Sequence, residues 1–261
     1  MSVKTDKRAK QILQAVLRHG TTSVDQLVEL TGASPASVRR DLTRLEEGGL
    51  VRRTRGGAKL AGQAQYEPFR FDSSFQERES RFTEEKRRIG VAAAELIAEH
   101  ETIGLTAGTT TTQIARCIRH RTGIHVVTNA VNIGMEFSNQ PGLNVTVIGG
   151  TLRWAGAFSL IGPIAIEAIS GIFMDKVFIG ATGIDPVRGA TAIEADEAAI
   201  FRAFARQSKK VILVADSSKV GMVSPSLICP LNQIDKIITD QGIDSDALDA
   251  FRAAGVEVLV V

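Results

Sequence analysis

Two kinds of hydrophobic spacing divide this chain of 261 residues. Near the N-terminus the apolar positions follow helical periodicity, most clearly at Val38, Leu42 and Leu45, which stand at i, i+4 and i+7. From about residue 84 onwards, short apolar runs alternate with amphipathic stretches. The first spacing predicts a short helix on a small core, and the second predicts strands and helices in turn. The pattern therefore predicts a small helical unit followed by a larger α/β unit.

The helix that carries this apolar stripe has a well-marked start and a helical neighbour before it. Ser34 can cap free backbone N–H groups, and Pro35 fits the first helical position because its missing N–H costs nothing there. Ser23 and Gln26 form a capping box for a preceding helix, and Thr31-Gly32-Ala33 supplies a tight turn between the two helices. This arrangement predicts a helix-turn-helix.

Further elements are predicted on both sides of the helix-turn-helix. Apolar residues between Ala9 and Leu17 predict a first helix that ends near His19-Gly20. Residues 50–60 have the pattern of a β-hairpin with a basic tip, which is typical of a wing. The sequence thus predicts a winged helix-turn-helix DNA-binding domain over residues 1–60.

A basic surface is predicted on residues 34–49, opposite the apolar stripe. Small residues at the start of this helix allow close entry into a major groove, where Arg39 and Arg40 can address guanine edges or phosphates. The candidate DNA-contacting residues of the helix and wing are Ser34, Pro35, Ala36, Ser37, Arg39, Arg40, Thr43, Arg44, Arg52, Arg53 and Arg55. An ordinary three-helix subdomain with solvated arginines is the alternative. The cap, turn, stripe, basic face and wing occur together and in order, which favours DNA binding.

The charge distribution agrees with a DNA contact confined to the first domain. Residues 1–60 hold 12 Lys and Arg against 6 Asp and Glu, a net charge of +6. Because the whole chain carries +2, the remaining residues carry −4. A basic domain on a mildly acidic one is typical of a nucleic-acid footprint limited to the basic part.

The larger domain is predicted over residues 84–261, after a linker at residues 61–83. Buried strands are predicted at residues 102–106, 125–128, 145–148, 176–179, 211–215, 236–239 and 256–261. Helices are predicted near residues 84–99, 110–121, 130–139, 162–172, 194–208 and 244–254. Alternation of this kind predicts an α/β fold with a mostly parallel sheet covered on both faces.

Glycine-rich or polar segments follow five of these strands. They are Gly108–Thr112, Thr128-Asn129, Gly149-Gly150, Gly180–Gly183 and Asp216–Lys219. Ligands in parallel sheets bind at the carboxyl ends of strands, and a helix N-terminus favours an anion. The sequence therefore predicts an anion-binding site at this edge of the sheet.

Structural explanations remain open for individual members of this predicted site. Threonines after Gly108 can simply cap a helix, Lys219 can be a solvated lysine, and Glu197 can belong to a favourable first-turn charge cluster. The segment is not a nucleotide P-loop, because it lacks the lysine of that motif.

Other functional classes receive little support from composition. The two cysteines, Cys117 and Cys229, lack metal-ligand spacing and are expected to be reduced and buried. The four histidines are scattered, and no apolar stretch approaches the roughly 20 residues of a membrane span. We expect no metal, no cofactor and no membrane association.

Both halves of the chain resemble the DeoR family of bacterial transcription regulators. The resemblance rests on residues 34–42, Leu45-Glu46, 49–53 and 56–58 in the first domain. In the larger domain it rests on residues 85–90, 107–110, 128–129, 149–153, 180–185, Glu197 and 215–219. The family usually has aspartate where Thr106 stands, so the way in which a ligand is held can differ here.

The resemblance implies a larger domain shaped like sugar-phosphate isomerases and coenzyme A transferases, with the ligand pocket kept and catalysis usually lost. It also implies a cytoplasmic homo-oligomer, commonly a repressor of carbohydrate metabolism genes, that responds to a phosphorylated sugar or related metabolite. The implied effector-binding residues are Thr106, Gly108, Thr109, Thr110, Thr111, Asn129, Gly149, Gly150, Gly180, Gly183, Glu197, Asp216 and Lys219. Among them, Gly108–Thr111 and Lys219 are expected to hold the anion, and Asn129, Glu197 and Asp216 the hydroxyl groups.

Three functional hypotheses follow from these observations. The leading one is a non-enzymatic, ligand-controlled transcription regulator. The first alternative is a sugar-phosphate isomerase-like enzyme with a DNA-binding head, in which Glu197 or Asp216 is the base and Lys219 stabilises developing charge. The second is an architectural DNA-binding protein whose larger domain is purely structural.

Overall fold

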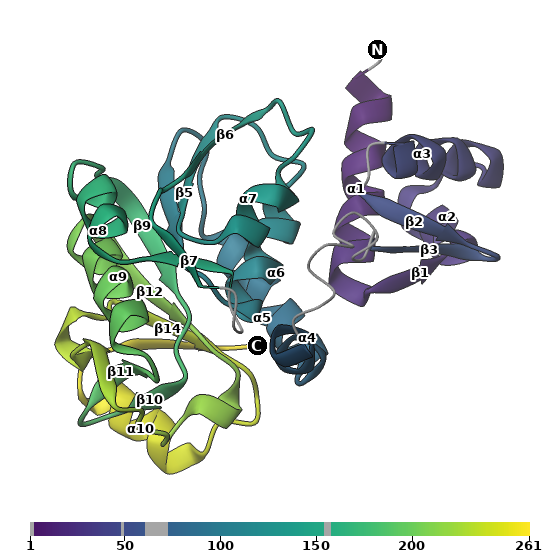
Figure 1. Cartoon of the computed structure of the whole chain (residues 1–261). Helices are drawn as coiled ribbons and strands as arrows, with labels where there is room; N and C mark the ends of the chain where they lie inside the picture. Colours follow the sequence, from purple (N-terminus) through teal and green to yellow (C-terminus); the bar gives the residue numbers. More distant parts are fainter. Residues whose placement is uncertain (1–2, 48–49, 61–72, 154–157) are drawn as a thin grey trace. The chain divides into compact units, whose positions relative to one another are not determined.

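The computed structural model describes residues 3–47, 50–60, 73–153 and 158–261 (Figure 1). The chain divides into two compact units, residues 1–70 and residues 71–261.

The first unit is a three-helix bundle with a small antiparallel sheet. Its elements are α1 (Val3–His19), β1 (Thr21–Ser23), α2 (Val24–Thr31), α3 (Pro35–Glu47), β2 (Val51–Thr54) and β3 (Gly57–Leu60). Val38, Leu42 and Leu45 are buried, so the predicted apolar stripe of α3 faces the core. The capping box of Ser23 and Gln26 is present at the start of α2. The helices and the wing predicted from sequence are therefore confirmed.

The wing is tied to the helices through strand β1, which the sequence analysis did not predict. The sheet order is β1-β3-β2, with both neighbouring pairs antiparallel. At Gly57 the backbone of β3 approaches β1 so closely that an added Cβ atom would lie 2.0 Å from the carbonyl oxygen of Thr22. Only glycine fits this crossing, because any other side chain would occupy the space of the neighbouring backbone.

The second unit is built on one seven-stranded parallel sheet, as predicted. Its strands are β4 (Thr102–Leu105), β5 (Ile124–Thr128), β6 (Leu143–Val147), β9 (Met174–Ile179), β12 (Ser208–Val214), β14 (Lys236–Thr239) and β15 (Glu257–Val260). The strand order is β15-β14-β12-β9-β4-β5-β6. All six neighbouring pairs are parallel, and the α/β fold class is confirmed.

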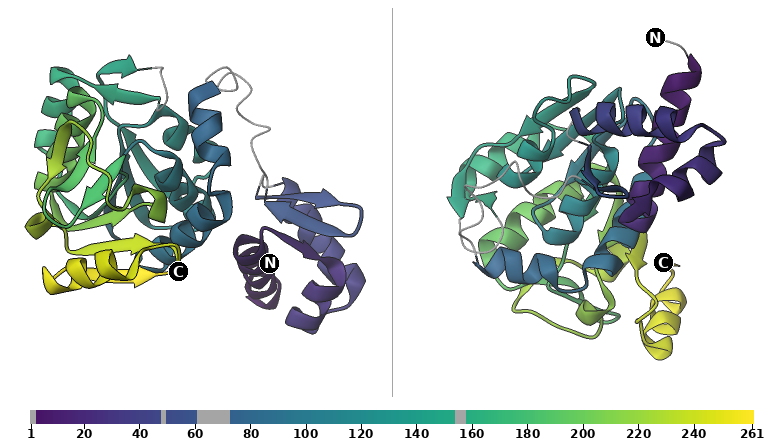
Figure 2. Two further views of the ribbon diagram at one scale, coloured as in Figure 1. Left: turned by 90° about the horizontal axis from the view of Figure 1, so that it is seen from below. Right: turned by 90° about the vertical axis from the view of Figure 1, so that its right-hand side faces the viewer.

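Helices cover both faces of this sheet. They are α5 (Thr83–Glu95), α6 (Thr109–Ile118), α7 (Val131–Glu136), α8 (Pro163–Ser170), α9 (Ala195–Arg206) and α10 (Ser245–Ala253). Helices α8 and α9 lie on one face, and α5, α6 and α7 lie on the other (Figures 1 and 2). Two smaller sheets, which were not predicted, contain β7 (Thr151–Arg153) and β8 (Ser159–Ile161), and β10 (Gly183–Asp185), β11 (Gly189–Ala192) and β13 (Ser226–Cys229).

The strand order reverses between β4 and β9. From β4 the chain proceeds outwards through β5 and β6, and from β9 it proceeds in the opposite direction through β12, β14 and β15. The loops that leave the two adjacent strands therefore diverge and open a crevice at their carboxyl ends. The crevice lies where Ala107–Gly108 follows β4 and Gly180 follows β9.

The predicted linker requires a correction. Residues Ser73–Ser80 form helix α4 of the second unit, although the sequence analysis placed residues 61–83 in a linker. Phe75 is buried and packs edge-on against Phe158, with 5.2 Å between ring centroids. Because α4 is polar apart from Phe75, it has no apolar periodicity to reveal it. Residues 61–72 of the predicted linker lie outside the described residues.

Candidate functional site

The outer face of α3 presents basic side chains to solvent. Arg39, Arg40 and Arg44 are exposed, and within the described ranges none of them takes part in an ion pair with an acidic side chain. Ser34, Pro35 and Ala36 are exposed at the start of the helix, and the Oγ atom of Ser34 accepts the backbone N–H of Ser37 at 3.3 Å. Ser37 and Thr43 are half-buried. Helix α3 therefore begins with small side chains, and its exposed face carries positive charge further along the helix.

The wing extends the same set of basic residues and is joined to α3. Arg52, Arg53 and Arg55 are exposed. The guanidinium of Arg53 donates to the Oγ1 atom of Thr43 at 3.1 Å, and its backbone N–H donates to the Oε1 atom of Glu46 at 2.9 Å. These two bonds connect the first strand of the wing to α3.

A cavity of about 280 Å³ opens in the second unit at the carboxyl ends of β4, β9 and β12. Its lining residues come from four parts of the chain. They are Arg78, Arg81, Phe82 and Lys86; Ala107–Thr110; Gly180–Thr182 with Ala192, Glu197 and Phe201; and Val214–Asp216 with Ser218 and Lys219. The cavity is therefore at the reversal of strand order, as expected for a ligand site in this class of sheet.

The N-terminus of α6 forms one wall of the cavity. Gly108 is in extended conformation just before the helix, and the side chains of Thr111 and Thr112 both donate to its carbonyl oxygen, at 2.9 and 2.7 Å. The first backbone N–H groups of a helix have no partner within it. Those of Thr109 and Thr110 are consequently available, together with the helix dipole, for an anion in the cavity.

Two lysines bring positive charge to the cavity. Lys219 is half-buried, and nothing within the described parts of the chain pairs with its ammonium group. Lys86 is buried, donates to the carbonyl oxygen of Arg81 at 2.6 Å and to that of Arg78, and lies 4.0 Å from Asp216. Burial lowers the pKa of Lys86, an effect that the Asp216 carboxylate opposes.

Glu197 is the carboxylate that enters the cavity from α9. It is buried, and its Oε2 atom lies 3.5 Å from the guanidinium of Arg153. Burial raises the pKa of Glu197, and the nearby charge of Arg153 opposes the rise. A carboxyl group of this kind can accept or donate a hydrogen bond, which suits a ligand hydroxyl.

Seven of the thirteen predicted effector residues lie together in the cavity wall. They are Gly108, Thr109, Thr110, Gly180, Glu197, Asp216 and Lys219. The other six lie outside the lining. They are Thr106, Thr111, Asn129, Gly149, Gly150 and Gly183.

Four residues outside the lining have partners within the protein. Thr106 is fully buried, and its Oγ1 atom accepts the backbone N–H of Gly180 at 3.2 Å. Asn129 accepts the backbone N–H of Ala107 at 2.9 Å and so supports the loop before α6. Thr111 donates to Gly108, and an added Cβ at Gly183 would lie 2.3 Å from the carbonyl oxygen of Met222. Thr106, Asn129 and Thr111 thus support residues of the cavity wall without lining the cavity themselves.

Gly149 and Gly150 follow β6, two strands away from the reversal of strand order. Gly150 adopts a positive φ of 133°, and an added Cβ there would lie 2.7 Å from the carbonyl oxygen of Ile161. Its glycine identity therefore reflects backbone packing against β8.

Four cavity residues in and between α4 and α5 are not predicted from the sequence, namely Arg78, Arg81, Phe82 and Lys86. The first three were within the predicted linker. Lys86 belongs to the family motif of residues 85–90, but no role was predicted for it. The one signal in the sequence is that a lysine stands on the apolar side of a predicted helix, in line with Ile89 and Ala93. No side chains of His, Cys, Asp or Glu gather in threes as a metal site in the described ranges, and burial raises the pKa of Cys117 and Cys229 to about 12.

None of the helices in the described parts of the chain has both the length and the apolar composition that a membrane crossing requires.

Two family models match this chain, each over one of its units. A model of the DeoR-like helix-turn-helix domain matches residues 8–64, and a model of the DeoR C terminal sensor domain matches residues 81–241. The chain is 34% identical over 257 residues to the HTH-type transcriptional repressor GlcR of Bacillus subtilis, covering 98% of this chain and 96% of that protein. It is 34% identical over 253 residues to the HTH-type transcriptional regulator GlpR of Haloferax volcanii, covering 97% and 96%.

Ribose 5-phosphate isomerase from Plasmodium falciparum is one of the solved structures that match part of this chain. The match covers 52% of each chain, with 15% sequence identity and a TM-score of 0.38.

Proposed function

Because this chain belongs to the DeoR family of transcriptional regulators, we propose that it represses carbohydrate metabolism genes and releases operator DNA when a phosphorylated sugar or related metabolite occupies the cavity. The cavity binds this effector without converting it. The protein acts in the cytoplasm as a homo-oligomer, since paired DNA-binding units match paired half-sites.

One observation carries the effector part of this proposal: the N-terminus of helix α6 and Lys219 line the same cavity. The backbone N–H groups of Thr109 and Thr110 and the ammonium of Lys219 offer an anion both directional donors and charge. Asp216 and Glu197 add carboxyl groups for the hydroxyls of a sugar. A sugar phosphate fits this set of groups, because it carries a phosphate and several hydroxyls in one small molecule.

The DNA-binding part is supported by the arginines of α3 and the wing. Arg39, Arg40 and Arg44 are exposed and are not held by acidic side chains of the described chain. Such a face supplies the electrostatic attraction to phosphates on which DNA affinity depends. Ligand control requires only that the effector bind the DNA-free arrangement more tightly than the DNA-bound one.

A melting-temperature screen tests the effector proposal. Phosphorylated sugars, sugar acids and polyols are compared, and a phosphorylated sugar at 100 times its Kd should stabilise the protein by about 2.7 kcal/mol. The same compound should lower the affinity for operator DNA in an anisotropy titration.

A pair of lysine variants provides the control. Lys219→Ala should abolish the stabilisation, whereas Lys210→Ala should retain it, because Lys210 lies at the opposite end of β12 and pairs with Asp235 at 2.8 Å. Equal stabilisation of both variants would remove Lys219 from the site. Turnover of the compound would instead favour the isomerase-like alternative.

A further inference from the structure

Helix α4 and the turn that follows it each contribute one arginine to the cavity, and few of the described side chains of α4 are buried. Arg78 and Arg81 both line the cavity. Of the α4 side chains that are described, only Phe75 and Glu79 are buried. The burial of one aromatic side chain is a small anchor for an otherwise polar helix.

Glu79 forms an ion pair with Arg116 of α6. The Nη1 atom of Arg116 lies 2.8 Å from Glu79 Oε1, and its Nε atom donates to Glu136 of α7 at 2.9 Å. Arg116 therefore bridges two carboxylates on different helices, both of them buried. In low-dielectric surroundings such a pair fixes geometry strongly, because separating the charges leaves one of them unpaired.

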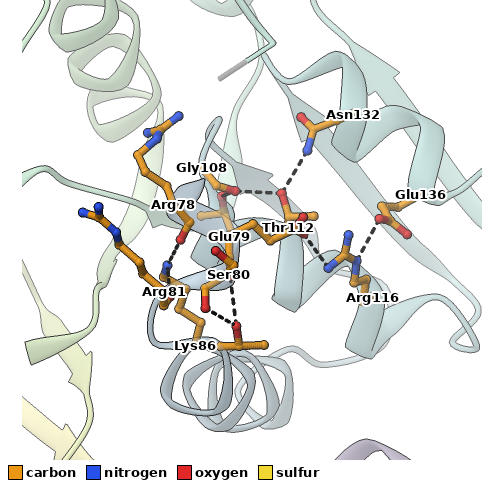
Figure 3. Close-up of polar contacts among 12 residues, drawn as sticks. Arg78, Glu79, Ser80, Arg81, Lys86, Gly108, Thr112, Arg116, Asn132 and Glu136 are labelled. Carbon is orange, nitrogen blue, oxygen red and sulfur yellow. Dashed lines mark hydrogen bonds and ion pairs between the residues drawn. The ribbon is translucent and has the colours of Figure 1, made fainter. Parts of the chain in front are cut away.

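The two sides of α4 make different contacts: Glu79 pairs with Arg116, and Arg78 lines the cavity. Figure 3 shows Glu79 directed towards Arg116, while the side chains of Arg78 and of Arg81, which follows the helix, point away from Arg116. Lys86 completes the attachment by donating to the backbone carbonyls of Arg78 and Arg81. Glu79 and Lys86 therefore hold α4 and the turn that follows it against α6 and α5.

We propose that Arg116, acting through Glu79, is a positioning residue for the anion site: it holds α4 so that Arg78 and Arg81 reach a bound phosphate. This inference rests on the proposed effector site and adds α4 to it.

Two substitutions, one at each carboxylate that pairs with Arg116, separate positioning from general stability. Glu79→Gln weakens the link to α4, whereas Glu136→Gln weakens the link to α7 and leaves α4 attached. Inorganic phosphate is the probe, and its binding is measured by calorimetry on the full-length protein. Glu79→Gln should lower phosphate affinity about tenfold, as expected for the loss of a charge-assisted contact, and Glu136→Gln should leave it unchanged.

Two further readouts connect the loss to α4. Amide hydrogen exchange should rise within residues 73–80 in Glu79→Gln and not in Glu136→Gln. The double variant Glu79→Gln/Arg78→Ala should bind phosphate no more weakly than the weaker single variant, because both remove the same contact.

The outcomes distinguish this inference from the proposed function. If the unmodified protein binds phosphate and Glu79→Gln binds it equally well, or if both substitutions weaken binding alike, the positioning role is overturned and the effector site stands. Absence of phosphate binding by the unmodified protein overturns the anion site and this inference together.

Discussion

The Oγ1 atom of Thr106 accepts the backbone N–H of Gly180 at 3.2 Å, which joins the ends of β4 and β9 beside the cavity. These are the two strands between which the sheet order reverses. The threonine hydroxyl is fully buried and its own hydrogen is directed to the carbonyl of Phe178 at 3.5 Å. A residue that resemblance to the family marked as ligand-binding is thus occupied with holding the crevice together.

Thr106→Val tests this relationship. The valine has nearly the same shape but leaves the N–H of Gly180 without an acceptor, so the free energy of unfolding should fall by about 1–3 kcal/mol in urea titration. Thr106→Ser retains the hydroxyl and should lose less. A valine variant as stable as the original protein would show that the bond contributes nothing.

Arg40→Ala tests the DNA-binding face. The loss should be about 1–3 kcal/mol and confined to certain operator sequences if Arg40 contacts a base, and smaller and uniform if it contacts only phosphate. Operator affinity and its salt dependence are measured by anisotropy. Arg252→Ala, an exposed arginine of α10 in the sensor unit, is the control and should bind DNA normally. Unchanged affinity of Arg40→Ala would contradict the assignment of this residue.

Gly57→Ala tests the close crossing of β1 and β3. The new methyl group would lie 2.0 Å from the carbonyl oxygen of Thr22, so the strands must separate, at a cost of about 1–3 kcal/mol. Gly56→Ala is the matched control, since nothing lies within 4 Å of its added Cβ. Thermal melting of both variants decides the matter, and similar melting temperatures would contradict the crossing.

Glu197→Gln should stabilise the protein at neutral pH while weakening effector binding. Burial raises the pKa of Glu197, so the folded state favours the protonated carboxyl group. Its contribution to stability is present below the unfolded pKa, near 4.5, and is lost as pH rises through the folded pKa. The glutamine never ionises and avoids this loss. Melting curves from pH 4 to pH 8 should therefore diverge as pH rises, and parallel curves would contradict the prediction.

Asp240→Asn should lower stability above the acid range. Burial alone would raise the pKa of Asp240, but the backbone N–H groups of Ser217 and Gly242 and the hydroxyl of Ser217 donate to it, and its pKa is lowered. Its contribution is present above the unfolded pKa, near 3.8, and is lost as pH falls through the folded pKa. The difference between the two proteins in urea unfolding should thus shrink towards low pH. Because Ser217 begins the turn that carries Lys219, phosphate affinity should fall as well.

The division into two units, the helix-turn-helix and the seven strands of the parallel sheet are all predictable from the amino-acid sequence. Val38, Leu42 and Leu45 define the core side of α3 through local periodicity, and Gly32 and Ser23 mark helix ends through backbone geometry and capping. These signals are local, since they depend only on neighbours along the chain. The rule that ligands bind at strand ends then placed Gly108, Gly180 and Asp216 near one another.

Which polar residues face the cavity depends on contacts between distant parts of the chain. Asn129 and Thr106 are polar residues that follow strands, as ligand-binding residues do. Their side chains instead accept the backbone N–H groups of Ala107 and Gly180. Helix α4 shows the converse, because it is too polar for its sequence to predict burial and is held by Arg116, 37 positions after Glu79. A charge pair between distant residues leaves no periodic pattern in the sequence, so folding alone brings Arg78 and Arg81 to the site.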